Sequence, residues 1–443
     1  MNLSFVNNMT ERTSVKNWIV VPLIVLAVAV CFAQANARES ADIIVAKDGS
    51  GNFTTIQAAV DSVPKHADKM WIIFIKNGTY NEKVLITKSN IALAGEDKDS
   101  TRIEYAELRS NWRKDHTSDI GAAVISIGNN VTDLTIANLT VYNNYGALHD
   151  SHDHQFAIRG GGKCTRIIVV NCNVWADGGD TMSLWNPESG MYYQANCSFK
   201  GYVDYVCPRG WCYITESKFY GYNSNASIWH DGSVDSTSKF VIRNSSFDGI
   251  SDFPLGRYHK DAQFYLLDCR FSKNMADSLI YPVVEPSKYR WGQRTYFYDC
   301  HREGGDFSWF KDNLQSAYGG PVKESDVTAA WTFKGEWNPE RTMMPVLPFA
   351  SLPTPRNNHP DFPLSGSDSL HWIGARNAIS YDVYFGNSSE PKRVGNQKET
   401  FYVPSNLALN TTYRWRVDAV TDGGTIKGET WVFTTATGKS GSK

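Results

Sequence analysis

A short motif recurs along the middle of this chain of 443 residues and constrains its fold more than any other feature. Each copy, such as VNCNV at residues 170–174, sets a polar residue between two short β-prone runs. The polar position falls at residues 138, 171, 196, 216, 244 and 268, with successive spacings of 33, 25, 20, 28 and 24 residues. Units this short cannot bury a core alone, but stacked units can. The repeat predicts an all-β protein in which residues 43–340 form a parallel β-helix.

The unequal spacings predict loops of varying length on one side of the solenoid, where binding sites usually lie. Long helical patterns are nearly absent from residues 85–335, which argues against βαβ units. Residues 54–64 differ, because Thr54 or Thr55 can cap a short helix that Pro64 ends. Its apolar face would cover the open end of the first coil, before a buried strand at residues 71–75.

The two ends of the chain differ from the repeat region. Residues 1–37 contain basic residues, then an apolar run and a small-x-small cleavage site, a pattern that predicts a signal peptide. An uncleaved anchor helix is the alternative. We therefore expect a secreted or periplasmic protein without membrane contact after cleavage. Residues 341–365 are proline-rich and predict a linker. Residues 366–436 resemble a fibronectin type III β-sandwich, with core aromatics at Trp372, Tyr413, Trp415 and Trp431.

Cleavage after residue 37 leaves seven cysteines, an odd number. Four of them directly follow an asparagine or an aspartate, which indicates buried positions of the repeat: Cys172, Cys197, Cys269 and Cys300. Cys207 and Cys212 are the best candidates for a disulfide bond.

Two aspartates, Asp180 and Asp204, lie 24 residues apart, about one repeat. If each repeat is one coil, their carboxylates lie on one wall of the solenoid. Gln155, 25 residues before Asp180, and Arg257, 53 residues after Asp204, fall in the same column. Two close carboxylates shift each other's pKa, so that one can attack an ester while the other protonates the leaving group. A structural ladder of polar residues is the alternative interpretation.

Several segments resemble the pectin methylesterases in content and in order, over residues 43–335. They lie at residues 48–59, 78–82, 155–157, 179–181, 201–206 and 255–257. The resemblance implies a right-handed parallel β-helix that hydrolyses methyl esters of polygalacturonate to methanol and pectate. It further implies pectin as the partner, a monomer, and no cofactor or metal.

The resemblance also implies a role for each residue of the column. Asp204 would be the nucleophile, Asp180 the general acid and then base, Arg257 the cation that holds Asp204 ionised, and Gln155 an oxyanion donor. Substrate contacts would come from Thr79, Tyr205, Tyr258 and His259.

Three departures from the family pattern put substrate preference and rate in question. Gly179 stands where the family has a second oxyanion-stabilising glutamine, and the loss of such a donor can cost about a hundredfold in rate. Residues 204–208 read DYVCP where the family has DFIFG, and residues 257–259 read RYH where it has RPW.

Other functions follow from the same sequence. A β-helix hydrolase or lyase would cut the glycosidic bonds of a polysaccharide, and a degenerate relative would only bind pectin. A net charge of −2 argues against nucleic acid as a partner. Residues 149–154 (HDSHDH) are dense in possible metal ligands, but we expect a solvated polar loop there.

Overall fold

The computed structural model describes residues 41–230, 235–259, 262–283, 294–364 and 368–438. The predicted signal peptide at residues 1–37 lies outside these ranges. Among the described residues, no helix is both long enough and apolar enough to span a bilayer.

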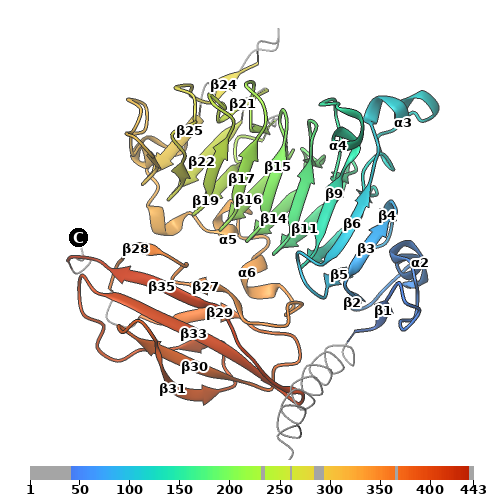
Figure 1. Ribbon diagram of the computed structural model, residues 1–443. Coiled ribbons are helices and arrows are strands. Elements are labelled where there is room, and N and C mark those ends of the chain that lie inside the picture. The colour runs from blue at the N-terminus through green and yellow to red at the C-terminus, as the bar shows by residue number, and fades with distance from the viewer. Residues whose placement is uncertain (1–40, 231–234, 260–261, 284–293, 365–367, 439–443) are drawn as a thin grey trace, which may run out of the picture.

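Three parallel sheets form the first domain (Figure 1). Sheet A contains β1 (Ile43–Val45), β2 (Trp71–Ile75), β5 (Ile91–Gly95), β8 (Thr132–Ala137), β11 (Thr165–Val170), β14 (Met191–Ala195), β16 (Trp211–Thr215), β19 (Phe240–Arg243), β22 (Gln263–Leu267) and β25 (Arg294–Tyr298). Sheet B contains β3 (Gly78–Asn81), β6 (Thr101–Tyr105), β9 (Thr140–Asn143), β12 (Asn173–Ala176), β15 (Ser198–Gly201), β17 (Lys218–Gly221), β20 (Ser246–Gly249), β23 (Arg270–Phe271) and β26 (His301–Arg302). Sheet C contains β4 (Val84–Ile86), β7 (Ile125–Ile127), β10 (Ile158–Gly160) and β13 (Met182–Leu184), then β18 (Ile228–His230), β21 (Gly256–Tyr258) and β24 (Tyr281–Pro282).

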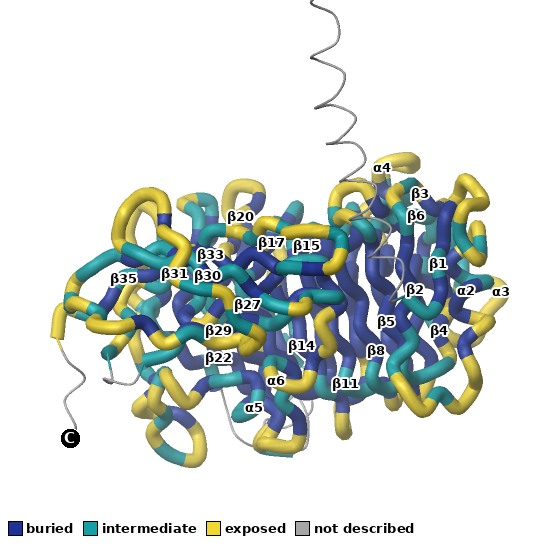
Figure 2. The backbone as a smooth tube through the Cα atoms, turned by 90° about the horizontal axis from the view of Figure 1, so that it is seen from below, coloured by how far each residue is buried: buried dark blue, intermediate teal, exposed yellow. Residues whose placement is uncertain are grey.

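From β4 onward the chain visits the sheets in the order C, A, B, and each round is one coil. Val206 bridges β13 and β18 through Met182 and Ile228, so sheet C continues across all coils. Inside, equivalent phenylalanines of successive coils stack with ring centroids 5.2, 4.2 and 5.1 Å apart: Phe199, Phe219, Phe247 and Phe271. Figure 2 shows buried residues along the stacked strands and exposed residues in the loops. The predicted parallel β-helix is confirmed.

The recurring polar residue occupies the corner between sheets A and B. Its φ is positive in every coil from Asn138 to Asp299, a left-handed conformation that Asn and Asp adopt more readily than most residues. Asn171 donates to Asn138 Oδ1 at 2.7 Å and accepts from Asn196 Nδ2 at 2.9 Å. The motif therefore marks a sharp corner, and the side-chain amides at this corner form hydrogen bonds from one coil to the next.

Replacing Asn171 by alanine is expected to lower the free energy of unfolding by about 2–3 kcal/mol. Alanine disfavours the left-handed corner, and the substitution removes two hydrogen bonds of a nearly buried side chain. Asn130→Ala is the control, because its φ of +63° imposes the same backbone cost at an exposed site. Urea unfolding of both variants measures the difference, and equal losses would show that the ladder adds nothing.

The first coil is covered as predicted. Helix α2 (Ile56–Ser62) is capped by Thr55, whose Oγ1 accepts from Ala58 N at 3.4 Å, and it ends before Pro64. Its residues Ile56 and Val60 are buried against the first strands. Two further short helices, α3 (Arg109–Asp115) and α4 (Tyr145–His149), lie in connections between coils.

All seven described cysteines are buried and free. The buried positions predicted for the four repeat cysteines are confirmed: Cys172, Cys197, Cys269 and Cys300. The disulfide predicted between Cys207 and Cys212 is wrong. Cys212 points into the core from β16, whereas Cys207 lies by Asp180 and Ser183 on the sheet C side, so the two thiols face apart.

A connecting segment covers the outer face of sheet A before the second domain begins. It contains η1 (Leu314–Ser316), η2 (Glu324–Asp326), α5 (Ala329–Thr332) and α6 (Pro339–Thr342). Its apolar side chains, Phe333 and Trp337 among them, pack on outward residues of sheet A such as Tyr193 and Tyr213. In Figure 1, α5 and α6 lie between the β-helix and the second domain.

The second domain has two β-sheets. One contains β27 (Ser351–Thr354), β29 (Leu370–Ile373) and β32 (Phe401–Tyr402), and the other β28 (His359–Phe362), β30 (Ser380–Gly386), β31 (Lys392–Gln397), β33 (Thr412–Thr421), β34 (Gly424–Ile426) and β35 (Thr430–Thr435). The four predicted core aromatics are buried between them: Trp372, Tyr413, Trp415 and Trp431. The predicted linker, residues 341–365, is too long, because β27 and β28 pair with β29 and β35 and so already belong to the sheets.

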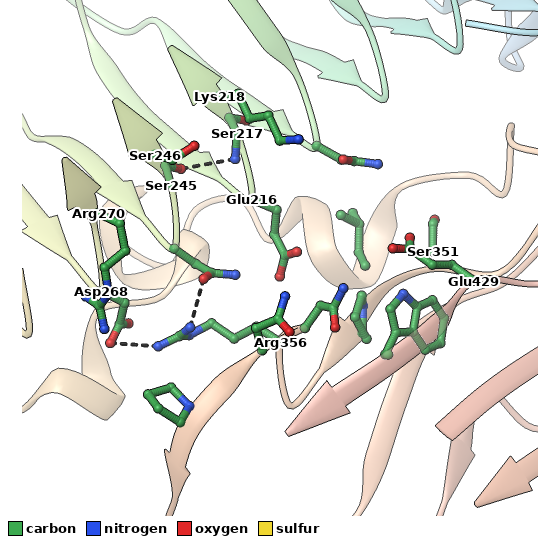
Figure 3. A pocket seen from close by; sticks show the side chains of 18 of the residues that line it. Glu216, Ser217, Lys218, Ser245, Ser246, Asp268, Arg270, Ser351, Arg356 and Glu429 are labelled. Carbon is green, nitrogen blue, oxygen red and sulfur yellow. Dashed lines mark hydrogen bonds and ion pairs between the residues drawn. The ribbon is translucent and has the colours of Figure 1, made fainter. Parts of the chain in front are cut away.

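A cavity of about 550 Å³ lies between this domain and the corner of sheets A and B (Figure 3). Arg356 crosses it, with Nη2 2.7 Å from Asp268 Oδ1 and Nη1 2.8 Å from Asn244 Oδ1. None of the predicted site residues lines this cavity. It belongs to the domain interface and not to the aspartates.

Candidate active site

The connections from sheet B to sheet C carry Gln155, Asp180 and Asp204 of the predicted column, whereas Arg257 lies in β21 of sheet C. Asp180 and Asp204 each stand two residues before a position of sheet C, at Met182 and Val206, which pair with each other. Asp180 N donates to Val203 O at 3.1 Å, so the two aspartates lie on adjacent coils. Both have a left-handed backbone, with φ of +58° and +53°. These connections therefore direct both carboxylates to the same side of the solenoid.

Asp204 forms a bidentate ion pair with Arg257 of β21. Arg257 Nε lies 3.0 Å from Asp204 Oδ1, and Nη2 lies 2.6 Å from Oδ2. Arg257 reaches across the intervening coil, where the small Ala226 accepts a hydrogen bond from Asp204 N. Asp204 is only 2% exposed, and burial raises the pKa of its carboxyl to about 6, although Arg257 acts to lower it. The carboxylate is thus oriented, and it is ionised above about pH 6.

Asp180 contributes the second carboxyl group. Its negative charge adds to the rise in the pKa of Asp204, so the two groups interact electrostatically. Asp180 is 6% exposed, and its Oδ1 atom is buried without a hydrogen-bond partner. The imidazole of His154 lies nearby, with Nε2 3.9 Å from Asp180 Oδ1. An unpaired buried carboxyl oxygen is costly, and such groups are found where chemistry uses them.

Gln155 lies on the coil preceding Asp180, and Gln155 N donates to Gly179 O at 3.0 Å. Its fully buried amide is turned toward its own loop, where Oε1 accepts from Gly146 N at 2.8 Å and Nε2 donates to Ser151 O at 2.7 Å. The amide stands next to the site, but these bonds occupy its oxygen and one of its two N–H donors.

The four predicted substrate contacts are scattered. Tyr205 is 0% exposed and packs in the core against Phe219, so the predicted substrate contact at Tyr205 is wrong. Tyr258 is also buried, at 4%. His259 is half-buried and contacts Trp229 edge-on at 5.6 Å. Thr79 is exposed on β3. This strand lies three strands away in sheet B from β12, the strand that leads to Asp180.

Alternating arginine and tryptophan side chains, here called the Arg–Trp stack, line the outer face of sheet C. Arg159 and Arg209 lie 4.2 and 3.9 Å from the ring of Trp185, and Arg209 and Arg257 lie 4.8 and 5.6 Å from that of Trp229. Sequence reasoning missed Arg159 and Arg209. The signal was present, because Arg159 follows the inward Ile158 and must point outward in a strand.

The histidine-rich loop at residues 149–154 has no metal-binding geometry. No group of three or more possible ligands is arranged to hold a metal among the described residues. His149 packs on Tyr145, while His152 stacks on Tyr202 at 4.4 Å and bonds to Asp177 O at 2.7 Å. The loop is thus held by its own contacts beside the site.

Fold and site together define a class: a parallel β-helix with two aspartates and an arginine on one wall. Residues 42–255 match the family model described as Pectinesterase. Probable pectinesterase 30 of Arabidopsis thaliana is 32% identical over 171 residues, and pectinesterase 2 of Citrus sinensis is 30% identical over 168. Each match covers 38% of this chain but only 31% and 30% of the relative. Residues 42–255 are therefore similar to the pectinesterase family, and the chain spans about a third of the length of these relatives.

Solved structures support the fold. Pectin methylesterase PemA from Erwinia chrysanthemi superposes with a TM-score of 0.55 and 20% identity, over 68% of this chain and 98% of that one. The pectin methylesterase from Aspergillus niger superposes with a TM-score of 0.53 and 18% identity, over 68% and 96%.

Proposed function

We propose that this protein hydrolyses methyl esters of polygalacturonate, releasing methanol and a free carboxylate. The observation that carries the proposal is the bidentate Asp204–Arg257 pair beside the unpartnered carboxyl oxygen of Asp180. One carboxylate is thereby oriented and ionised, and the other is available for proton transfer.

In the first half of the reaction, a carboxylate oxygen of Asp204 attacks the ester carbonyl carbon, and the carbonyl oxygen takes up the negative charge. The intermediate collapses, the bond from carbon to the methoxy oxygen breaks, and protonated Asp180 gives its proton to that oxygen. Methanol leaves, and an anhydride joins Asp204 to the substrate. Arg257 holds the attacking group in place throughout.

In the second half, Asp180 is ionised and takes a proton from water. The resulting hydroxide adds to the substrate carbonyl carbon of the anhydride and expels the carboxylate of Asp204. The product is a galacturonate carboxylic acid, which releases its proton to the solvent and leaves as the carboxylate, and both aspartates return to their starting states.

Pectin as the substrate rests on two kinds of support. Of the Arg–Trp stack, Trp185 is 38% exposed and offers an aromatic surface that suits a sugar ring, and the Arg257 side chain is 27% exposed and offers a guanidinium group that suits a uronate carboxylate. A structurally similar pectin methylesterase, with a TM-score of 0.53 and 20% identity, has been solved in complex with a hexasaccharide. We further propose that the protein is exported, that it is a monomer, and that its second domain is a fibronectin type III domain.

Product analysis on highly methylated pectin tests this function. We expect methanol to be released while the viscosity of the solution is unchanged. Shortened or unsaturated oligomers would favour a glycosidic hydrolase or lyase instead. Binding of pectin with no turnover by the wild-type protein would indicate a degenerate relative.

A further inference from the structure

The space beside Gly179 is filled by two neighbours. A Cβ atom at residue 179 would meet Val203 Cγ1 and Val203 O at 3.0 Å each, closer than ordinary contact, and His154 Cδ2 at 3.8 Å. A side chain at residue 179 would therefore press against Val203 and begin within van der Waals distance of the imidazole of His154. The imidazole thus lies directly beside the position that a side chain at residue 179 would take.

Hydrogen bonds hold the backbone of His154 in this place. Its carbonyl oxygen accepts from Arg109 N at 3.0 Å, and the next residue, Gln155, donates its N–H to Gly179 O at 3.0 Å. A Cβ at Gly178 would lie 2.0 Å from Asp153 O, so the two backbones are in close contact. The His154 side chain itself is 45% exposed, so its ring stands at the open edge of the site.

The geometry at Asp180 indicates what the imidazole can do. His154 Nε2 lies 3.9 Å from Asp180 Oδ1, too far for a hydrogen bond but suited to two groups that contact one ligand. An ester presents its methoxy and carbonyl oxygens from the same carbon. With the methoxy oxygen at Asp180, the carbonyl oxygen can reach Nε2, which carries a donor proton in one neutral tautomer and in the cation.

We propose that His154 is a catalytic residue whose Nε2–H group donates to the oxyanion formed on the ester carbonyl. The hydrogen bonds of Gln155 to its own loop leave one N–H group of its amide free to donate. A second donor is therefore needed at this side of the site to stabilise the oxyanion. The inference rests on the proposed esterase function. It assigns to His154 the oxyanion donor that Gly179, which has no side chain, cannot supply.

His154→Ala is the test, measured as methanol release with kcat and KM determined separately. Loss of one oxyanion donor should lower kcat about a hundredfold with little change in KM, since the bond strengthens only as charge develops. His154→Gln restores an N–H donor and should recover at least tenfold of that loss. His152→Ala is the matched control, because His152 lies in the same loop but bonds to Tyr202 and Asp177.

A second variant tests the position itself. In the His154→Ala background, Gly179→Gln should regain activity, because its amide can enter the vacated space after Val203 shifts by a few tenths of an ångström. Gly179→Gln alone should gain nothing, since His154 already supplies the donor.

The outcomes separate this inference from the function on which it rests. An active wild type with kcat unchanged in His154→Ala, or lowered equally by His152→Ala, would overturn the role of His154 alone. An effect confined to KM would do the same, because it would indicate ground-state binding. A wild type that releases no methanol would overturn the proposed function, and the role of His154 with it.

Discussion

Replacing Asp204 by asparagine is expected to lower methanol release by about 10⁴-fold or more, as seen when a catalytic nucleophile is removed. The amide of asparagine cannot supply the attacking carboxylate oxygen. Asparagine is chosen because φ at this position is +53°, a conformation that Asn shares with Asp and that alanine disfavours. Initial rates on methylated pectin, together with pectin binding, measure the effect.

The fold should survive this substitution. Because burial raises the pKa of Asp204 to about 6, its contribution to folding stability is present below its ordinary pKa and is lost as the pH rises through about 6. An uncharged asparagine avoids the cost of burying the ionised group at pH 7. Arg257 loses its partner, but its side chain is 27% exposed and can be hydrated. We therefore expect an unchanged melting temperature and unchanged binding.

Asp252→Asn is the matched control for this experiment. Asp252 also has a left-handed backbone, with φ of +61°, but it is exposed and outside the column. Its substitution should leave the rate at the wild-type level. An Asp204→Asn protein that keeps more than a tenth of wild-type activity would show that the nucleophile lies elsewhere.

Replacing Arg257 by glutamine is expected to lower activity at pH 7 by about 10²–10³-fold. The substitution leaves Asp204 buried without its ion-pair partner, so its pKa must rise above about 6 and the attacking carboxylate becomes protonated. Activity needs the ionised form, so the rate falls tenfold for each pH unit below that pKa. The acidic limb of the pH profile should therefore begin near pH 6 in the wild type and move to higher pH in the variant.

Profiles of kcat/KM between pH 4 and pH 9 check this second expectation. Arg166→Gln is the control, because Arg166 makes a similar bidentate pair with Asp133, at 2.7 and 2.6 Å, on another face of the solenoid. Its profile should match that of the wild type. A uniform loss of activity in Arg257→Gln, with no displacement of the acidic limb, would show that the arginine only binds substrate.

The repeat was readable from the sequence because its signal is local. A left-handed corner selects Asn or Asp, and an inward position selects an apolar side chain, so Asn171 and Phe199 have counterparts in other coils. The column of Asp180, Asp204 and Arg257 could be predicted because their spacings of 24 and 53 residues are close to one and two repeats, so these residues are expected on neighbouring coils. The prediction of a disulfide between Cys207 and Cys212 was wrong because closeness in sequence does not tell which face of the wall a thiol points to.

Sequence alone thus determined the solenoid, the wall of the solenoid that carries Asp180 and Asp204, and the pairing of Asp204 with Arg257. Only the tertiary structure decided that Tyr205 points inward, that Arg159 and Arg209 meet Trp185, and that the imidazole of His154 lies beside Gly179 and Asp180. The physical reason is that these contacts join side chains of different coils. Their positions depend on the register between strands and on the path of the connecting loops, which hydrogen bonds between coils set and which spacing along the chain does not encode.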